Sequence, residues 1–307
     1  MSATLTSKQG VRSRLFGTHR TIITMVSVLL ALSSPVVAAD NNTGEPQTGF
    51  FDYLPAMPDI HLPKLDIIPF WTDDLKKGRK AYENGNFGRA MKYFKHSSED
   101  GNIVGDWYLA NMYRLGQGVT SDPAIAYSYY GRVAENFDPE ESDHTRLKVM
   151  VDSQLHIADY QRVGIPAANL PANPSAAARS YLRLASAYGH PGALYGLGVL
   201  NMMGEGVSKN PAQGLKWLTA AARQRNTEAE AYLGDLYWEG RDVKQSQTRA
   251  FMWYTLAIET ARPEEHAAII TRYNEMRSEI EDSTRLEAEA KARLWQDQYP
   301  ASLAKGP

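Results

Sequence analysis

The sequence contains no cysteine. This absence excludes disulfide bonds, thiol catalysis and zinc sites built from thiolates. Clustered basic residues are missing too: beyond residue 39 the chain has 29 basic against 35 acidic residues and no basic stripe. Because nucleic acids bind to positively charged surfaces, we expect no nucleic-acid partner.

The motifs of common enzymes are also absent. There is no His-Glu-x-x-His, no Gly-x-Ser-x-Gly and no Walker loop. Two stretches, Gly196-Leu197-Gly198 and Gly204-Glu205-Gly206, look superficially like a nucleotide-binding loop, but neither follows a predicted strand. We therefore predict a protein that is not an enzyme and that uses no cofactor and no metal.

The histidines beyond residue 39 are scattered, without the spacing of metal ligands. One interpretation makes them ordinary surface or core residues. The other is pH sensing, because histidine titrates in the mildly acidic range. His96 and His190 fall near the ends of predicted helices, where a protonated imidazole is stabilising, which argues against acid-triggered release at these two positions. The full set is His61, His96, His144, His156, His190 and His266.

The N-terminus carries an apolar run from Ile22 to Leu32 that is too short for the roughly 20 residues of a membrane-spanning helix. Basic residues precede the run, and Val37-Ala38-Ala39 follows it. This order is typical of a secretory signal peptide, whereas a retained spanning helix is the rival interpretation. We predict a signal peptide over 1–39, cleavage after Ala39, a periplasmic location and no membrane span after cleavage.

Residues 40–72 form a proline-rich stretch that is apolar between its prolines. Proline at this density disfavours helix and central strand, so an extended, polyproline-like tether is predicted. Two alternatives stay open for this segment: it packs on its own domain, or it docks on a partner. Exposed extended chain is also where proteolysis concentrates, so the tether is a candidate cleavage point.

From Asp73 onwards the sequence is helical in character and repetitive. Leu or Ile, then Gly or Ala, then Gly six residues later recurs four times. A second marker residue, proline in three instances, follows this last glycine after 7, 10, 7 and 7 residues. Three positions beyond the marker comes a small residue, and a pair of mostly large residues begins six positions beyond it. The four instances begin at Leu109, Ile157, Leu197 and Leu233, and their second markers are Pro123, Pro174, Pro211 and Gln247.

These residues describe a pair of packed helices. A glycine beside the leucine lets the second helix approach closely, and the next glycine ends the first helix in a left-handed conformation. Asp122-Pro123, Asn173-Pro174 and Asn210-Pro211 each place a capping side chain before a proline that starts the second helix. Because one pair buries only part of its apolar surface, the pairs must stack.

The predicted fold is therefore all-α, an α-solenoid of stacked helix pairs with an extended proline-rich N-terminal segment. A shorter tetratricopeptide-like unit with a tight loop at Asn84-Gly85-Asn86 precedes the four instances. This makes five repeats over 73–263, at about 73–100, 101–136, 145–188, 189–225 and 226–260. Residues 264–307 are predicted to form capping helices and a tail.

The motifs Gly116–Val119 and Gly204–Val207, with Asp-Pro or Asn-Pro and Ala-x-x-x-Tyr/Trp, resemble the Sel1-like repeat. The Gly164-Ile165-Pro166 break and the helix end Ala257–Pro263 resemble more particularly the periplasmic negative regulators of exopolysaccharide production, the ExoR type. This resemblance covers roughly 73–290 and implies binding to the periplasmic domain of a sensor histidine kinase, repression of its two-component system, and release by a periplasmic protease. A general exported scaffold for envelope or polysaccharide machinery is the alternative.

The partner is expected to bind to the surface lined by the first helices. Positions two before the motif leucine, and two and five after it, point to this surface. The mixture of aromatic residues and arginine is typical of binding hot spots, although Trp107, Tyr195 and Trp238 could instead belong to the core between repeats. The candidates are Arg79, Tyr82, Trp107, Asn111, Arg114, Arg162, Tyr195, Met202, Asp235 and Trp238.

Overall fold

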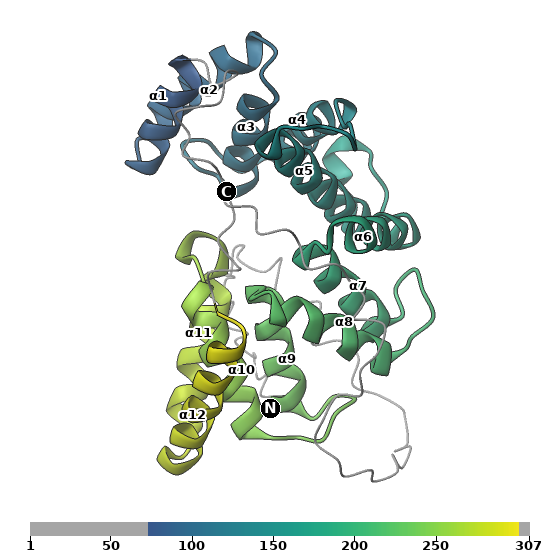
Figure 1. Cartoon of the computed structure of the whole chain (residues 1–307), viewed down its shortest axis with the longest axis vertical. Coiled ribbons are helices and arrows are strands. Elements are labelled where there is room, and N and C mark those ends of the chain that lie inside the picture. Colours follow the sequence, from purple (N-terminus) through teal and green to yellow (C-terminus); the bar gives the residue numbers. More distant parts are fainter. Residues whose placement is uncertain (1–72, 301–307) are drawn as a thin grey trace, which may run out of the picture. The chain divides into compact units, whose positions relative to one another are not determined.

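The computed structural model describes residues 73–300, and these residues are α-helical almost throughout (Figure 1). The predicted signal peptide (1–39), the proline-rich segment (40–72) and the tail (301–307) lie outside the described residues. The helices are α1 (Asp73–Glu83), α2 (Phe87–Glu99), α3 (Ile103–Leu115), α4 (Pro123–Glu135), α5 (His144–Val163), α6 (Pro174–Tyr188), α7 (Pro191–Met203), α8 (Pro211–Arg223), α9 (Thr227–Glu239), α10 (Gln247–Thr260), α11 (Pro263–Glu279) and α12 (Asp282–Gln298).

The second helices begin as the sequence predicts. The side chains of Asp122, Asn173 and Asn210 accept hydrogen bonds from backbone N–H groups in the first turns of α4, α6 and α8, each of which starts with proline. These caps satisfy donors that a helix start leaves without a partner. The predicted N-cap and proline pairs are confirmed.

Glycines end most of the first helices in the left-handed region. Gly116, Gly204 and Gly240 close α3, α7 and α9 with φ of 71°, 77° and 71°. The third repeat differs, because Gly164 combines φ 77° with an extended ψ of 164° and leads into a 3-10 turn at Pro166–Ala168. An antiparallel bridge between Ile165 and Leu170 closes this inserted loop.

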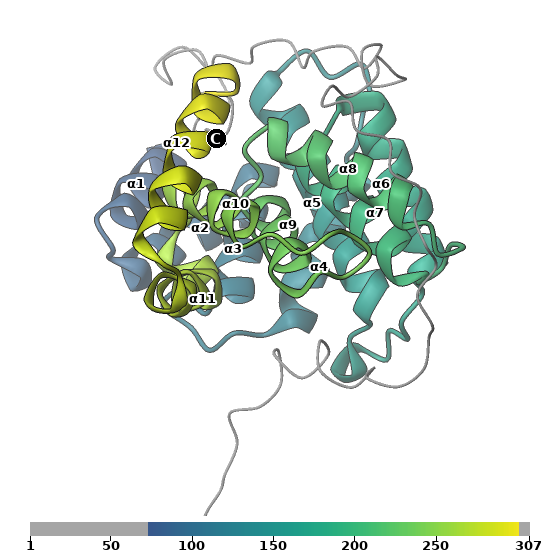
Figure 2. The same cartoon turned by 90° about the horizontal axis from the view of Figure 1, so that it is seen from below.

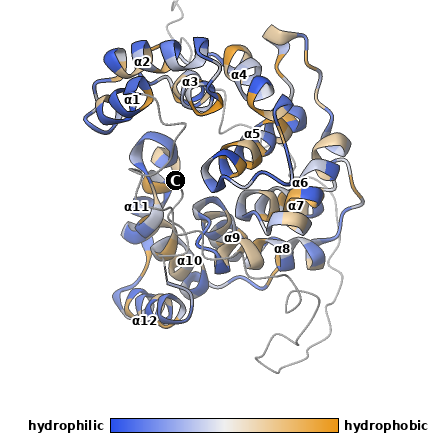
Figure 3. Ribbon diagram, turned by 45° about the horizontal axis from the view of Figure 1, so that its top comes forward, coloured by the Kyte–Doolittle hydropathy of each residue, from blue (hydrophilic) through white to orange (hydrophobic). Residues whose placement is uncertain are grey.

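Each helix from α1 to α10 packs against the next one along the chain, which confirms the predicted α-solenoid of helix pairs. Small residues permit the contact inside a pair: a Cβ added at Gly198 would lie 2.6 Å from Leu218, and one at Gly234 2.4 Å from Tyr254. One core cluster extends through α5–α10 to α12, and another covers α1–α5. Figure 3 shows more hydrophilic colour on the terminal helices α1 and α12 than on α7.

The last two helices depart from the pairwise pattern. Helices α11 and α12 both pack on α10, which lies between them (Figures 1 and 2). Helix α11 is bent at His266, whose φ of −114° and ψ of 24° are not helical. The bend lies one residue after Glu265, whose carboxylate is 3.0 Å from the Arg114 guanidinium of α3. The C-terminal helices therefore cap α10 and also contact the second helix pair.

A buried ion pair joins the fourth and fifth repeats. Arg225, in the turn between α8 and α9, places Nε 2.8 Å from Glu230 Oε1, and both side chains are at most 1% exposed. Its Nη2 donates to Glu259 at 2.8 Å and to the Leu256 carbonyl at 3.1 Å, both on α10. The turn is thus tied to the following helix pair.

Candidate functional site

Side chains from α3, α5, α7, α9 and α11 contact one another along a continuous surface, here called the first-helix face. On this face Trp107 Nε1 of α3 donates to Asp152 Oδ2 of α5 at 2.6 Å. The rings of Tyr195 on α7 and Tyr232 on α9 meet edge to face, with centroids 6.3 Å apart. Arg114 of α3 links this surface to α11, because its Nη2 donates a hydrogen bond to Glu265 Oε1. Of the predicted candidates, Trp107, Arg114 and Tyr195 therefore contribute to one connected surface.

On α1, Arg79 and Tyr82 are partly exposed. Arg79 Nε donates to Glu83 at 2.8 Å within the same helix. The Tyr82 hydroxyl donates to Gln117 Oε1 at 2.5 Å, and burial raises the pKa of this phenol above its ordinary value. Tyr82 also packs on Tyr108 of α3, so its ring helps to attach the first helix pair to the second.

On α3, the structure brings Asn111 and Arg114 together. Arg114 Nη2 donates to Asn111 Oδ1 at 3.1 Å, and Arg114 Nε donates to the Tyr130 hydroxyl at 3.2 Å. Asn111 is 8% exposed, and its side chain is engaged in hydrogen bonds within its own repeat. Arg114 is half-buried and connects this group to Glu265, so it acts as a link between helices as well as a surface residue.

The remaining candidates divide into exposed and internal positions. Arg162 on α5 retains 28% exposure of its side chain, with Glu205 3.9 Å away. Met202 is only 3% exposed and lies in the main core, so it offers no free surface. Asp235 accepts a hydrogen bond from Tyr254, and Trp238 lies under the Arg272 guanidinium at 5.7 Å.

A tyrosine of the second helix bonds to the first helix in three repeats. Tyr130 donates to Asn111 at 3.0 Å, Tyr181 to Asp159 at 2.7 Å, and Tyr254 to Asp235 at 2.8 Å. In the fourth repeat the equivalent positions are Val199 and Leu218, both buried. The residue two positions after the motif leucine is thus engaged within its own repeat. In three repeats it accepts a hydrogen bond that joins the two helices of the pair, and in the fourth it packs in the core.

The Tyr254→Phe variant is expected to lose about 1–2 kcal/mol of unfolding free energy, because the half-buried Asp235 carboxylate loses a donor. Burial raises the pKa of both groups, so the hydrogen bond forms in a weakly solvated site. Urea denaturation measures the change. The control is Tyr237→Phe. This ring on α9 is half-exposed, and its hydroxyl forms no hydrogen bond that is seen within residues 73–300. Equal losses of unfolding free energy in the two variants would contradict the role assigned to Tyr254.

Sequence reasoning did not place the histidines on this face. His156 lies between two carboxylates, with Nε2 3.6 Å from Asp152 and Nδ1 3.4 Å from Asp159. Burial lowers the pKa of His190 because it disfavours the charged imidazolium. Burial alone would raise the pKa of Asp152, but His156 and the Trp107 hydrogen bond favour the carboxylate and lower that pKa. The helical spacing of Asp152, His156 and Asp159 was the available signal. Within residues 73–300, no group of three or more such side chains has the arrangement of a metal site.

His266 was likewise missed. Its Nε2 is 3.2 Å from Glu228 of α9, and its Nδ1 accepts the backbone N–H of Arg262. No periodic pattern pointed to it, because it lies at the bend of α11, outside the repeat register. None of the helices in the described part of the chain is long and apolar enough to cross a membrane.

The family model of the Sel1 repeat matches residues 105–136, 191–226 and 227–259. These ranges hold the helix pairs α3–α4, α7–α8 and α9–α10. These three helix pairs are therefore Sel1 repeats. The pairs α1–α2 and α5–α6 fall outside the matched ranges; the first has a short turn between its helices, and the second carries the inserted loop and the 20-residue helix α5.

Among curated proteins, the chain is similar to two that are each named exopolysaccharide production negative regulator. The protein of Rhizobium leguminosarum bv. viciae is 29% identical over 242 residues, which is 78% of this chain and 80% of the relative. That of Rhizobium meliloti (strain 1021) is also 29% identical, over 62% of this chain and 69% of the relative. The similarity to both proteins thus extends well beyond the three matched repeats.

Solved structures with similar helices include a protective antigen of uropathogenic Escherichia coli with an SLR fold. It is 25% identical, with a TM-score of 0.49, over 76% of this chain and 47% of the antigen. A Sel1 repeat protein from Oxalobacter formigenes is 20% identical, with a TM-score of 0.46, over 73% of this chain and 91% of its own.

Proposed function

We propose that this protein is a negative regulator of exopolysaccharide production, and that it acts by binding another protein rather than by catalysis. The names of the two rhizobial relatives support the regulatory role, and the similarity covers most of each chain. Stacked helical repeats support the binding role, because such arrays present extended surfaces to their partners.

The proposed partner is the periplasmic sensing domain of a membrane sensor histidine kinase, whose two-component signalling the protein represses. Two features of the sequence support this part of the proposal: the signal-like N-terminus, which would deliver the chain to the periplasm after cleavage at Ala39, and the resemblance to the ExoR type. Release of the kinase would then switch on exopolysaccharide genes.

The observation that carries the binding proposal is the composition of the first-helix face. Trp107, Tyr195 and Trp238 are each partly exposed there, and Arg162 lies on the same face with a weak ion pair. Partly exposed tryptophan, tyrosine and arginine are the residues that dominate protein–protein binding energies. Arg162 is the best site to test because its side chain keeps 28% exposure and its ion pair with Glu205 is long, at 3.9 Å.

The test combines deletion with a matched pair of variants in the third repeat. Deletion of the gene should raise exopolysaccharide output and kinase-dependent transcription. Arg162→Ala, on α5, should fail to restore repression and should weaken binding to the purified kinase domain about 30-fold, as expected for a hot spot of about 2 kcal/mol. Arg179→Ala, exposed on α6 of the same repeat, should restore repression and bind normally.

Unchanged exopolysaccharide output after deletion would refute the regulatory role. If output rises but affinity capture recovers envelope or polysaccharide enzymes and no sensor kinase, the protein is a scaffold and the kinase assignment fails. Equal binding by both alanine variants would remove the first-helix face from consideration. Unfolding midpoints of both variants separate a lost contact from a lost fold.

A further inference from the structure

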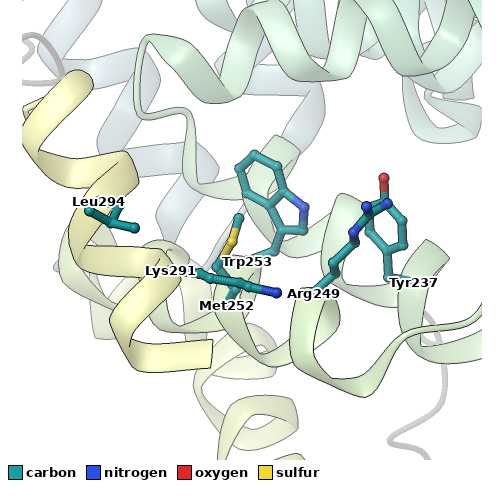
Figure 4. A pocket seen from close by; sticks show the side chains of 6 residues that line it. All are labelled: Tyr237, Arg249, Met252, Trp253, Lys291 and Leu294. Atoms are coloured by element: carbon teal, nitrogen blue, oxygen red, sulfur yellow. The ribbon is translucent and has the colours of Figure 1, made fainter. Parts of the chain in front are cut away.

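A pocket outside the first-helix face lies between α9, α10 and α12. It has a volume of about 310 Å³ and is lined by Tyr237, Arg249, Met252, Trp253, Lys291 and Leu294. Figure 4 shows Trp253 and Met252 beside the Lys291 and Leu294 side chains of α12, with Arg249 alongside Tyr237. Leu294 is 70% exposed, the most exposed of the large apolar side chains in the described range. We refer to this site as the α10–α12 pocket.

An aromatic row continues from the pocket along α12. Trp253 contacts Trp295 at a centroid distance of 4.8 Å, and Trp295 contacts Tyr299 at 4.6 Å. Arginine lies over an aromatic ring at each end: Arg249 is 5.3 Å from the Tyr237 ring, and Arg223 is 5.7 Å from the Tyr299 ring. The surface therefore combines flat apolar rings with two guanidinium groups.

Arg223, Arg249 and Trp295 supply hydrogen-bond donors to this surface. Within residues 73–300, neither the half-buried Arg223 nor the exposed Arg249 forms an ion pair with a carboxylate, whereas buried or half-buried arginines such as Arg114, Arg225 and Arg272 do. Arg223 Nε and Trp295 Nε1 are buried and have no hydrogen-bond partner in the same range. A buried donor without an acceptor costs about 1–3 kcal/mol, so this surface is complementary to a ligand that supplies carboxylates and carbonyl oxygens.

The segment that precedes α1 has this chemistry in its sequence. Aspartates recur every seven residues at Asp52, Asp59 and Asp66, and each is followed within four residues by a proline, at Pro55, Pro63 and Pro69. Apolar residues occupy most of the intervening positions, and Lys64 is the single Lys or Arg between 50 and 72. Proline-rich peptides bind aromatic-lined grooves, with their backbone carbonyls available to indole donors.

We infer that residues 50–72 bind in cis to the α10–α12 pocket and its aromatic row. The prolines and apolar residues pack on Trp253, Met252 and Leu294, and the aspartates pair with Arg249 and Arg223. Fifteen to twenty residues in the polyproline form extend about 45–60 Å, several times the spacing of neighbouring helices. Of the two alternatives for the tether, this inference selects packing on its own domain.

The test is site-specific photocrosslinking in the full chain. Benzoylphenylalanine in place of Leu294 should crosslink, in the monomer fraction, to peptides from residues 50–72. The matched control places the same probe at Leu182, which is 50% exposed on α6 and should give no such product. Arg249→Glu should lower the yield at position 294 about fivefold, a factor equivalent to the 1 kcal/mol upper range of an exposed ion pair, whereas Arg179→Glu should leave it unchanged.

Several results would overturn this inference. Crosslinks to 50–72 that appear only in a covalent dimer would assign the pocket to a second copy, and crosslinks only to another protein in cells would assign it to a partner. Equal yields at positions 182 and 294 would show non-specific contact. Circular dichroism of Arg249→Glu checks that the helices persist; a folded variant with unchanged crosslinking would exclude the proposed charge pairing.

Discussion

Replacing Arg225 by methionine should lower the free energy of unfolding by about 3–5 kcal/mol, the cost of leaving a buried charge without its partner. The Arg225 side chain is 1% exposed and bonds to Glu230, to Glu259 and to the Leu256 carbonyl. Methionine fills a similar volume but donates no hydrogen bond. Chemical denaturation at neutral pH, with circular dichroism at 222 nm as the helical signal, measures the loss.

The loss should depend on pH in a predictable direction. Burial raises the pKa of Glu230 above its ordinary value near 4.5, and one of its oxygens, Oε2, has no partner among the described residues. Between the ordinary and the raised pKa the unfolded chain releases a proton that the folded chain retains, so unfolding free energy falls as pH rises. Removing Arg225 widens this interval, and the Arg225→Met variant should therefore lose more stability at pH 8 than at pH 5.

A double variant provides the control for the buried pair. Arg225→Met combined with Glu230→Leu removes both charges and should recover most of the stability that the single change loses, because two apolar side chains often replace a buried ion pair at little cost. Arg179→Met, on the exposed face of α6, should change stability by less than about 0.5 kcal/mol. A loss below 1 kcal/mol in Arg225→Met, with no pH dependence, would contradict the assigned role of the pair.

The Gly206→Val variant is expected to lose about 2–5 kcal/mol of unfolding free energy. Gly206 has φ of +68°, where a β-branched residue is strained. A Cβ there would lie 2.4 Å from the backbone of Pro174 and Ser175, which cannot move as a flexible side chain can. The Ser175 hydroxyl also donates to the Gly206 carbonyl at 3.1 Å. The variant should therefore separate the loop after α7 from the start of α6, and thermal and urea unfolding would both report it.

The control for this prediction is a glycine without such neighbours. An added Cβ at Gly131, inside α4, meets no atom within 4 Å. Gly131→Ala should stabilise the protein by about 0.5–1 kcal/mol, because alanine is the better helix former. If Gly206→Val and Gly131→Ala shift the unfolding midpoint in the same direction, the close approach of the two repeats is not what requires glycine at position 206.

Local rules were sufficient to predict the helices and the fold class. The caps at Asp122, Asn173 and Asn210, and the glycine stops after α3, α7 and α9, depend on residues within a few positions of each boundary. Helix capping and left-handed termination are short-range effects, so one sequence suffices to recognise them. Stacking followed because no pair can bury its apolar surface alone.

The candidate face was predicted only in outline. Periodicity placed Trp107, Arg114 and Arg162 on the first helices, and all three are partly exposed in the structure. It also selected Met202, which is buried, because helical spacing does not reveal how much of each position the neighbouring repeat covers. The contact of His266 on α11 with Glu228 on α9 was missed because the two residues share no register. The contacts of His156 with Asp152 and Asp159 were missed although their spacing within α5 was visible in the sequence.

By itself, the sequence determined where helices begin and end, which residues pair them, and that the pairs stack. Tertiary structure alone decided which polar groups meet across long separations: Arg114 with Glu265, Arg225 with Glu259, and His266 with Glu228. The physical reason is range. Capping and packing within a pair join residues that are near one another in the sequence. A hydrogen bond between residues far apart in the sequence forms only when their atoms come within about 3 Å, and the stacking of the whole array sets that distance.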